Sequence, residues 1–252
     1  MKWLIAFLFL FTIVNAEELT TGNDNVALGY LSLGAQAGAA TTADDNVAIG
    51  SGAAQDLTSG DGNICIGKNA GDAVMTTAAY GTVAIGHEAG SALTSGAASC
   101  LVGYNAGKAL LSGDHNTALG TSALDAQVYG VRNTAIGYNS ISANATSATG
   151  DNTALGCNSG LGIYEGINNT IIGSGAGPQS LSTVHNTVII GKDAGAGTMT
   201  SHANGTIAIG HSAGKAITSG QYNTALGFEA LKTEDDGDKN TAIGYQALET
   251  LN

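Results

Sequence analysis

The stretch Asn116-Thr117-Ala118-Leu119-Gly120 decides the fold, because the same five-residue pattern returns along almost the whole chain. Aligned on the closing glycine, thirteen copies follow one another at intervals of 17 to 21 residues. A fixed period of this length is typical of a solenoid, in which each repeat buries its apolar side chains only by stacking on its neighbours. The thirteen closing glycines are Gly29, Gly50, Gly67, Gly86, Gly103, Gly120, Gly137, Gly156, Gly173, Gly191, Gly210, Gly227 and Gly244.

The two residues that flank the middle of each copy indicate a strand. The residue before the closing glycine is always Ile, Leu or Val, and the residue two places earlier is β-branched in twelve of the thirteen copies. A period of two combined with β-branching is typical of β-structure. We therefore predict an all-β fold, a parallel β-solenoid or β-roll of about thirteen coils of 17–21 residues each. The aliphatic residue before the glycine is expected to point into the core.

The middle residue of each copy is nearly always small and apolar, so both faces of the strand are apolar. An isolated solenoid needs only one buried face, and the second face is therefore predicted to contact another copy of the chain. The predicted self-association face consists of Ala27, Ala48, Ala84, Ala118, Ala135, Ala154, Ala208, Ala225 and Ala242.

Each coil also carries one large apolar residue after the closing glycine. Where the fourth residue after the glycine is Gly or Ala, an aliphatic follows about three places later, as in Leu57, Val74 and Leu93. Where the fourth residue is itself large, as in Ile141, the later site is polar. Each coil therefore has one large apolar residue at one of these two positions, which predicts a constant enclosed volume in every coil.

Polar residues mark the turn ahead of each strand. Asn lies four residues before the closing glycine in nine copies, and stacked Asn side chains are expected to hydrogen-bond the backbone and one another as a structural row. Acidic residues such as Asp44, Asp61 and Asp114 come just before this position and fit turn formation. A rank of Ca²⁺ sites, strongest over residues 234–240, is the alternative, although the glycine spacing fits neither an EF-hand nor the Gly-rich calcium nonapeptide.

Composition disfavours several functional classes. The 252 residues are 43% hydrophobic and only 11% charged, with a formal net charge of −12 and no cluster of Lys or Arg. An acidic chain of this kind is not expected to bind nucleic acid. The five histidines have no metal-ligand spacing, and no nucleophile is paired with a base. We expect no enzyme activity, no metal and no cofactor.

The first 16 residues read as a signal peptide. Lys2 precedes an apolar run over residues 3–14, and small residues end at Ala16. A run of about 12 residues is shorter than the roughly 20 that a spanning helix needs. We predict cleavage after Ala16, a solenoid domain over residues 17–252, and a secreted protein with no segment left in the membrane.

Three cysteines are too few and too scattered for a disulfide framework. Cys65 and Cys100 are expected to be small buried hydrophobic residues, and Cys157 is expected to be exposed.

Two features concern the outer surface. An aromatic residue follows the closing glycine in several copies, which predicts an outward row that is either a plain exposed row or a strip for contact with glycans or a cell surface: Tyr30, Tyr104, Tyr138, Phe228 and Tyr245. Glycosylation acceptor motifs begin at Asn144, Asn168 and Asn204, so the secreted protein is a candidate glycoprotein.

The unit Asn-Thr/Val-Ala-Ile/Leu-Gly-x-x-Ala/Ser resembles the head repeats of trimeric autotransporter adhesins, and it is similar to repeats of phage tail fibres and other extracellular fibres. The likeness runs from about Asn23 to Leu248, with coils longer than those of the adhesin heads. The resemblance implies a left-handed parallel β-roll, three copies packed about a common axis, and a role in adhesion or fibre building.

The leading hypothesis is a secreted structural protein that self-associates laterally as a homotrimer. Because little chain lies before the first copy or after the last to cap them, end-to-end growth into a filament is also expected. The alternative is a secreted adhesin or carbohydrate-binding rod that uses the aromatic row. An ice-binding solenoid is a weaker hypothesis, since no flat Thr-x-Thr array is present.

Overall fold

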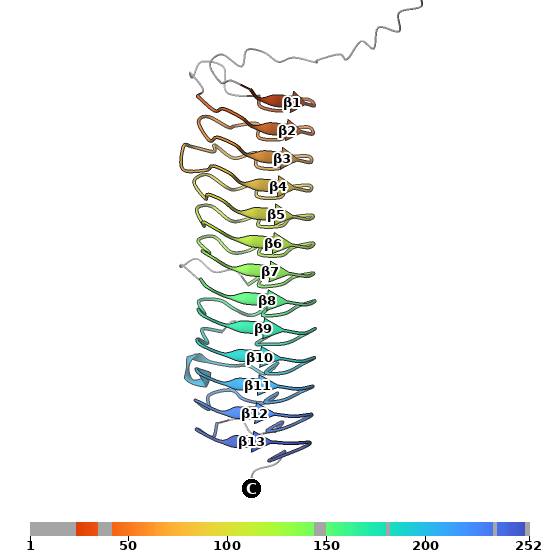
Figure 1. Cartoon of the computed structure of the whole chain (residues 1–252), viewed down its shortest axis with the longest axis vertical. Coiled ribbons are helices and arrows are strands. Elements are labelled where there is room, and N and C mark those ends of the chain that lie inside the picture. The colour runs from red at the N-terminus through yellow and green to blue at the C-terminus, as the bar shows by residue number, and fades with distance from the viewer. Residues whose placement is uncertain (1–23, 35–41, 144–149, 180–181, 234–235, 250–252) are drawn as a thin grey trace, which may run out of the picture.

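The computed structural model describes residues 24–34, 42–143, 150–179, 182–233 and 236–249, which form a parallel β-solenoid of about twelve turns. The coils stack along one axis, with all strands in one column (Figure 1). This arrangement confirms the predicted fold class. The strands are β1 Val26–Leu28, β2 Val47–Ile49, β3 Ile64–Ile66, β4 Val83–Ile85, β5 Cys100–Val102, β6 Thr117–Leu119, β7 Thr134–Ile136, β8 Thr153–Leu155, β9 Thr170–Ile172, β10 Val188–Ile190, β11 Ile207–Ile209, β12 Thr224–Leu226 and β13 Thr241–Ile243.

The sheet is strictly parallel, and its thirteen strands follow the order of the sequence. Equivalent residues pair in every step, so that Ala118 of β6 lies opposite Ala135 of β7. Each position of the repeat therefore forms a row along the molecule. At about 4.8 Å for each strand step, the twelve steps span roughly 58 Å.

The middle residues of the strands point into the coils, which reverses the predicted orientation of the strands. The flanking aliphatic residues face outward instead, and Leu119, for example, is 48% exposed. Each coil is narrow and already holds a large side chain from its opposite arc, so the inward strand position has room for little more than a methyl group. The predicted self-association face is therefore wrong. Its residues form part of the core, fully buried except for the partly buried Ala27: Ala27, Ala48, Ala84, Ala118, Ala135, Ala154, Ala208, Ala225 and Ala242.

The predicted exchange is visible in the core, because Leu93 is fully buried in a coil with Gly at the fourth position, and Ile141 is itself buried at that position. A further exchange involves the inward strand position. Leu101 occupies the inward strand position of its coil, and a Cβ added to Gly107 would lie 2.9 Å from a Leu101 methyl carbon. Ile171 and Gly177 show the same exchange. One predicted core residue is wrong, because Val74 is exposed while the neighbouring Met75 is fully buried.

The closing glycines are required by the stacking of the coils. Their φ angles lie between 125° and 140°, a region that side chains of L-residues rarely adopt. In addition, a Cβ on Gly120 would lie 2.6 Å from the carbonyl oxygen of Gly137 in the next coil. The glycine row therefore lets successive coils approach to strand spacing.

Longer coils bulge on the side of the stack away from the strands, as expected for insertions confined to one arc (Figure 1). One such arc, between β10 and β11, carries the short 3-10 helix η1, Ser201–Ala203. Within the described parts of the chain, no helix has the length and apolar character needed to cross a membrane. The predicted signal peptide, residues 1–16, lies outside the described residues.

Candidate functional site

The outer face of the sheet is a continuous uncharged surface of aliphatic side chains and threonines. Val, Thr, Ile and Leu occupy its two rows, broken only by Cys100, and none of the thirteen described strands contains a charged residue. Exposure is high for many of these side chains, reaching 48% at Leu119 and 65% at Ile243. Extended exposed apolar patches on soluble proteins mark interaction surfaces. We call these two rows the outer sheet face.

The cysteines lie in three different environments. Cys65 is buried as predicted, and burial raises the pKa of its thiol to about 12. Cys100 was predicted to be buried, but it is exposed, because it occupies the first, outward position of β5. Cys157 is exposed and follows a closing glycine.

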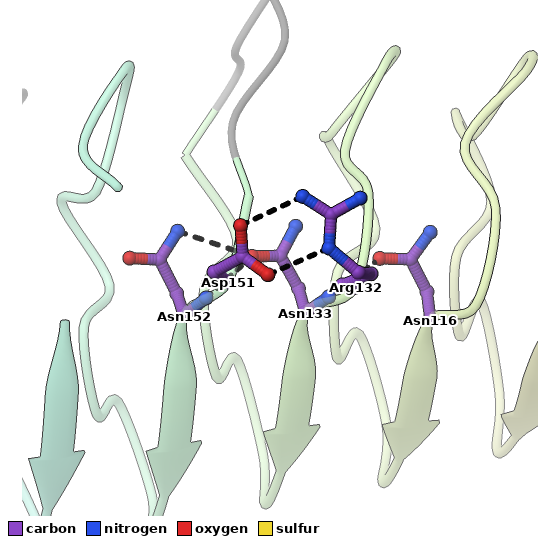
Figure 2. Close-up of polar contacts among 5 residues, drawn as sticks. All are labelled: Asn116, Arg132, Asn133, Asp151 and Asn152. Carbon is purple, nitrogen blue, oxygen red and sulfur yellow. Dashed lines mark hydrogen bonds and ion pairs between the residues drawn. The ribbon is translucent and has the colours of Figure 1, made fainter. Parts of the chain in front are cut away.

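The asparagine row forms a buried polar spine, in agreement with the structural interpretation. The side-chain oxygen of Asn116 accepts a hydrogen bond from the backbone N–H of Asn133 at 3.0 Å, and Asn133 accepts one from Asn152 at 3.1 Å. The Asn152 amide also donates to Asn133 Oδ1 at 3.0 Å (Figure 2). It donates to the carbonyl of Gly166 as well, at 2.8 Å. These buried groups satisfy one another and link neighbouring coils.

Beside the spine, acidic side chains cap exposed turns. Asp61 and Asp114 each accept a backbone N–H from the preceding coil at 2.9 Å, which supports the turn interpretation. Arg132 donates to both carboxylate oxygens of Asp151, at 2.7 and 2.8 Å (Figure 2). The Arg132 guanidinium holds the pKa of Asp151 below its usual value.

The aromatic row projects outward as predicted. Its members are 43% to 73% exposed, and all follow a closing glycine. His87 and His211 take part in the row as well, as their positions after a closing glycine predict. His87 stacks on Tyr104 with ring centroids 5.3 Å apart, while His211, Phe228 and Tyr245 stack in series at 5.2 and 5.4 Å.

An open groove of about 420 Å³ crosses three successive coils near β4, β5 and β6. Lys108 lies at its centre and forms an ion pair with Glu88 of the preceding coil, which lowers the pKa of Glu88. Asp125 lines the groove in the following coil, and burial raises the pKa of its carboxyl group. The groove is lined by Ser91, Ala92, Lys108, Ala109, Asp125 and Ala126.

The glycosylation motifs differ in accessibility. Asn168 is exposed and its amide donates to Asn186 at 3.1 Å, whereas Asn204 is half-buried and accepts the backbone N–H of His185. Asn144 lies outside the described residues.

The remaining sequence hypotheses concern metal sites. In the described ranges, no three or more His, Cys, Asp and Glu residues come together as potential metal ligands. Glu234, at the start of the considered calcium segment, lies outside those ranges, and Asp238 caps the backbone N–H of Gln221 at 2.7 Å.

Comparison of the chain with models of known protein families, with curated proteins and with solved structures finds no match.

Proposed function

We propose that the chain is a structural rod of an extracellular fibre and that copies associate laterally through the outer sheet face. The observation that carries this proposal is the uncharged, largely aliphatic surface that runs over all thirteen strands. A partner that covers such a surface must be equally long and share its strand-to-strand repeat. A second copy of the same chain meets both conditions.

Charge favours the same face. The chain carries a formal net charge of −12, so two copies repel each other over most approaches. The outer sheet face has no charged side chain in its strands and is the surface on which like-charged copies meet with the least electrostatic cost. Association there also removes exposed Leu and Ile side chains from water.

A single pairwise contact through this face buries less area than a standard interface. A strip about 58 Å long and about 10 Å wide covers roughly 600 Å², against about 800 Å² for each partner in a standard interface. A homotrimer, as the likeness to adhesin heads implies, lets each copy contact two neighbours. End-to-end stacking of β13 on β1 of another copy would extend the same parallel pairing into a filament and is part of the proposal.

The test is the mass of the native particle by light scattering at several concentrations. The wild-type chain is expected to form a trimer. Leu119→Glu with Leu155→Glu, which places two charges on the outer sheet face, is expected to give monomers with an unchanged β-type circular dichroism spectrum. Tyr80→Glu, at an exposed turn position, is the control and should remain trimeric. A wild-type chain that is monomeric at all concentrations would refute the proposal.

A further inference from the structure

Where two neighbouring coils both carry an aromatic side chain in this row, the two rings stack face to face and turn their edges to solvent. His87 and Tyr104 are inclined by only 15°, and Phe228 and Tyr245 by 9°, so each ring covers a face of the next. A ring face stays open only where the following coil carries a small residue at this position. Such a gap occurs once between two tyrosines, and Tyr104 and Tyr138 are its walls.

Thr121 lies between these two tyrosines in the row. The backbone N–H of Ser122 donates to the Tyr104 carbonyl, and that of Asn139 donates to the Thr121 carbonyl, so the three coils are in register. Tyr104 is 53% and Tyr138 is 52% exposed. One face of Tyr104 is covered by His87, which leaves the other face toward Thr121. The register therefore places Thr121 between two exposed tyrosines of the preceding and following coils, and we call this gap in the row the slot.

The width of the slot selects what it can hold. Two strand steps separate its walls by about 9.6 Å. Two van der Waals contacts take about 3.5–4.0 Å each, which leaves about 2 Å for the thickness of the inserted group. A flat aromatic ring, with all its atoms in one plane, is too thin. A puckered pyranose is thicker than a planar ring and has two apolar faces of axial C–H bonds.

The groove described above adjoins this slot. Lys108 lies four residues after Tyr104 in the same coil, and its amino group is paired with Glu88 of the preceding coil. Asp125 is hydrogen-bonded to Ser122, the residue after Thr121. An amino group and a carboxylate beside the slot provide a donor and an acceptor for sugar hydroxyl groups, while Ala92, Ala109 and Ala126 give the groove an apolar floor.

We propose that Tyr104, Thr121 and Tyr138 hold one pyranose ring of a glycan between the two tyrosine rings, with Lys108 and Asp125 binding hydroxyl groups of the adjoining sugar. The ligand class is a β-linked glucan or N-acetylglucosamine oligomer, because all ring substituents of these sugars are equatorial and both faces are apolar. A galactose ring carries an axial hydroxyl group on one face and fits less well.

The experiment is titration of the protein with cellohexaose and with N-acetylchitohexaose by calorimetry, with β-1,4-galactohexaose for comparison. We expect binding of at least one of the first two, and binding weaker by about tenfold or more for the galactose oligomer. Tyr104→Ala with Tyr138→Ala should weaken binding by about tenfold or more. Tyr30→Ala, in the same row but without a tyrosine two coils away, should leave it unchanged.

A second variant separates the slot from a general effect of tyrosine. Thr121→Tyr keeps both walls and completes the stack, so it should abolish binding while the circular dichroism spectrum and particle mass stay unchanged. The proposal is overturned if neither glucose-type oligomer binds, if Thr121→Tyr binds as the wild type does, or if the galactose oligomer binds as tightly. Loss of the trimer in the mass measurement would refute the proposed function and leave this site standing.

Discussion

Gly120 shows how one backbone position limits the spacing of the coils. Gly120→Ala adds a Cβ 2.6 Å from the Gly137 oxygen and forces an alanine to a φ of +137°. We expect the free energy of unfolding to fall by about 2–5 kcal/mol, from backbone strain and overpacking together. Gly62→Ala is the matched control, because its φ is also positive but its Cβ would meet nothing within 4 Å, and about 1 kcal/mol is expected. Urea denaturation measures the free energy of unfolding of both variants. Equal decreases in the two variants would contradict the steric explanation.

The buried spine makes a second prediction at the residue scale. Asn133→Ala removes the acceptor for the backbone and side-chain N–H groups of Asn152 and leaves these buried donors without it. Each buried donor without an acceptor costs about 1–3 kcal/mol. We therefore expect the free energy of unfolding, measured by urea denaturation, to fall by at least that amount. Gln221→Ala serves as the control, because Gln221 bonds Asp238 through its backbone N–H, and its loss should stay below about 0.5 kcal/mol.

The pH response of the exposed Arg132–Asp151 pair follows from the lowered pKa of Asp151. A carboxyl group with a lower pKa in the folded state stabilises the fold above its unfolded pKa, and this contribution is lost as the pH falls through the folded pKa. Arg132→Gln should therefore raise the pKa of Asp151 toward its ordinary value. Carboxyl NMR titration checks this shift, and an unchanged pKa would show that the ion pair does not form in solution.

At the scale of the coil, the inward strand position and the fourth residue after the glycine share one volume. Ala118 occurs with the buried Leu124, whereas Ile171 occurs with Gly177. Ala118→Ile alone should overpack the coil and cost about 1–3 kcal/mol. Leu124→Gly alone should cost about 2–5 kcal/mol through the cavity it leaves.

The double variant Ala118→Ile with Leu124→Gly reproduces the combination seen at Ile171 and Gly177. Its free energy of unfolding should fall by clearly less than the sum of the decreases in the two single variants. A double-mutant cycle of unfolding free energies detects this difference. Additive losses would mean that the two positions do not share space. Folding of each variant is verified first by its circular dichroism spectrum.

The strands themselves were readable from the sequence, because β-branching and a strict closing glycine repeat thirteen times. Their orientation was not, since both faces of each strand are apolar and hydrophobicity alone cannot separate them. The deciding signal was side-chain size: Ala fits the narrow interior, and Ile or Leu fits the open outer face. Cys100 was misplaced for the same reason. The groove around Lys108 and Asp125 depends on contacts between three coils, which no single copy of the repeat displays.

At the scale of the whole molecule, the parallel order of the strands means that each coil pairs only with its two neighbours. Stability is then close to a sum of coil and interface contributions along a line. A local defect should weaken its own neighbourhood and leave distant coils folded. The inward alanines and the buried spine favour this behaviour, since their contacts also join adjacent coils.

Hydrogen exchange with mass spectrometry tests this in Gly120→Ala, which disturbs the contact between the coils of β6 and β7. We expect amide protection to fall in peptides that cover β5 to β7, while peptides that cover β2, β3, β11 and β12 keep the protection of the wild type. Gly62→Ala should show no such local minimum at β6. If protection instead fell equally in all coils, the rod would unfold as one cooperative unit, and coupling beyond nearest neighbours, for example through association along the whole outer sheet face, would have to hold the thirteen strands together.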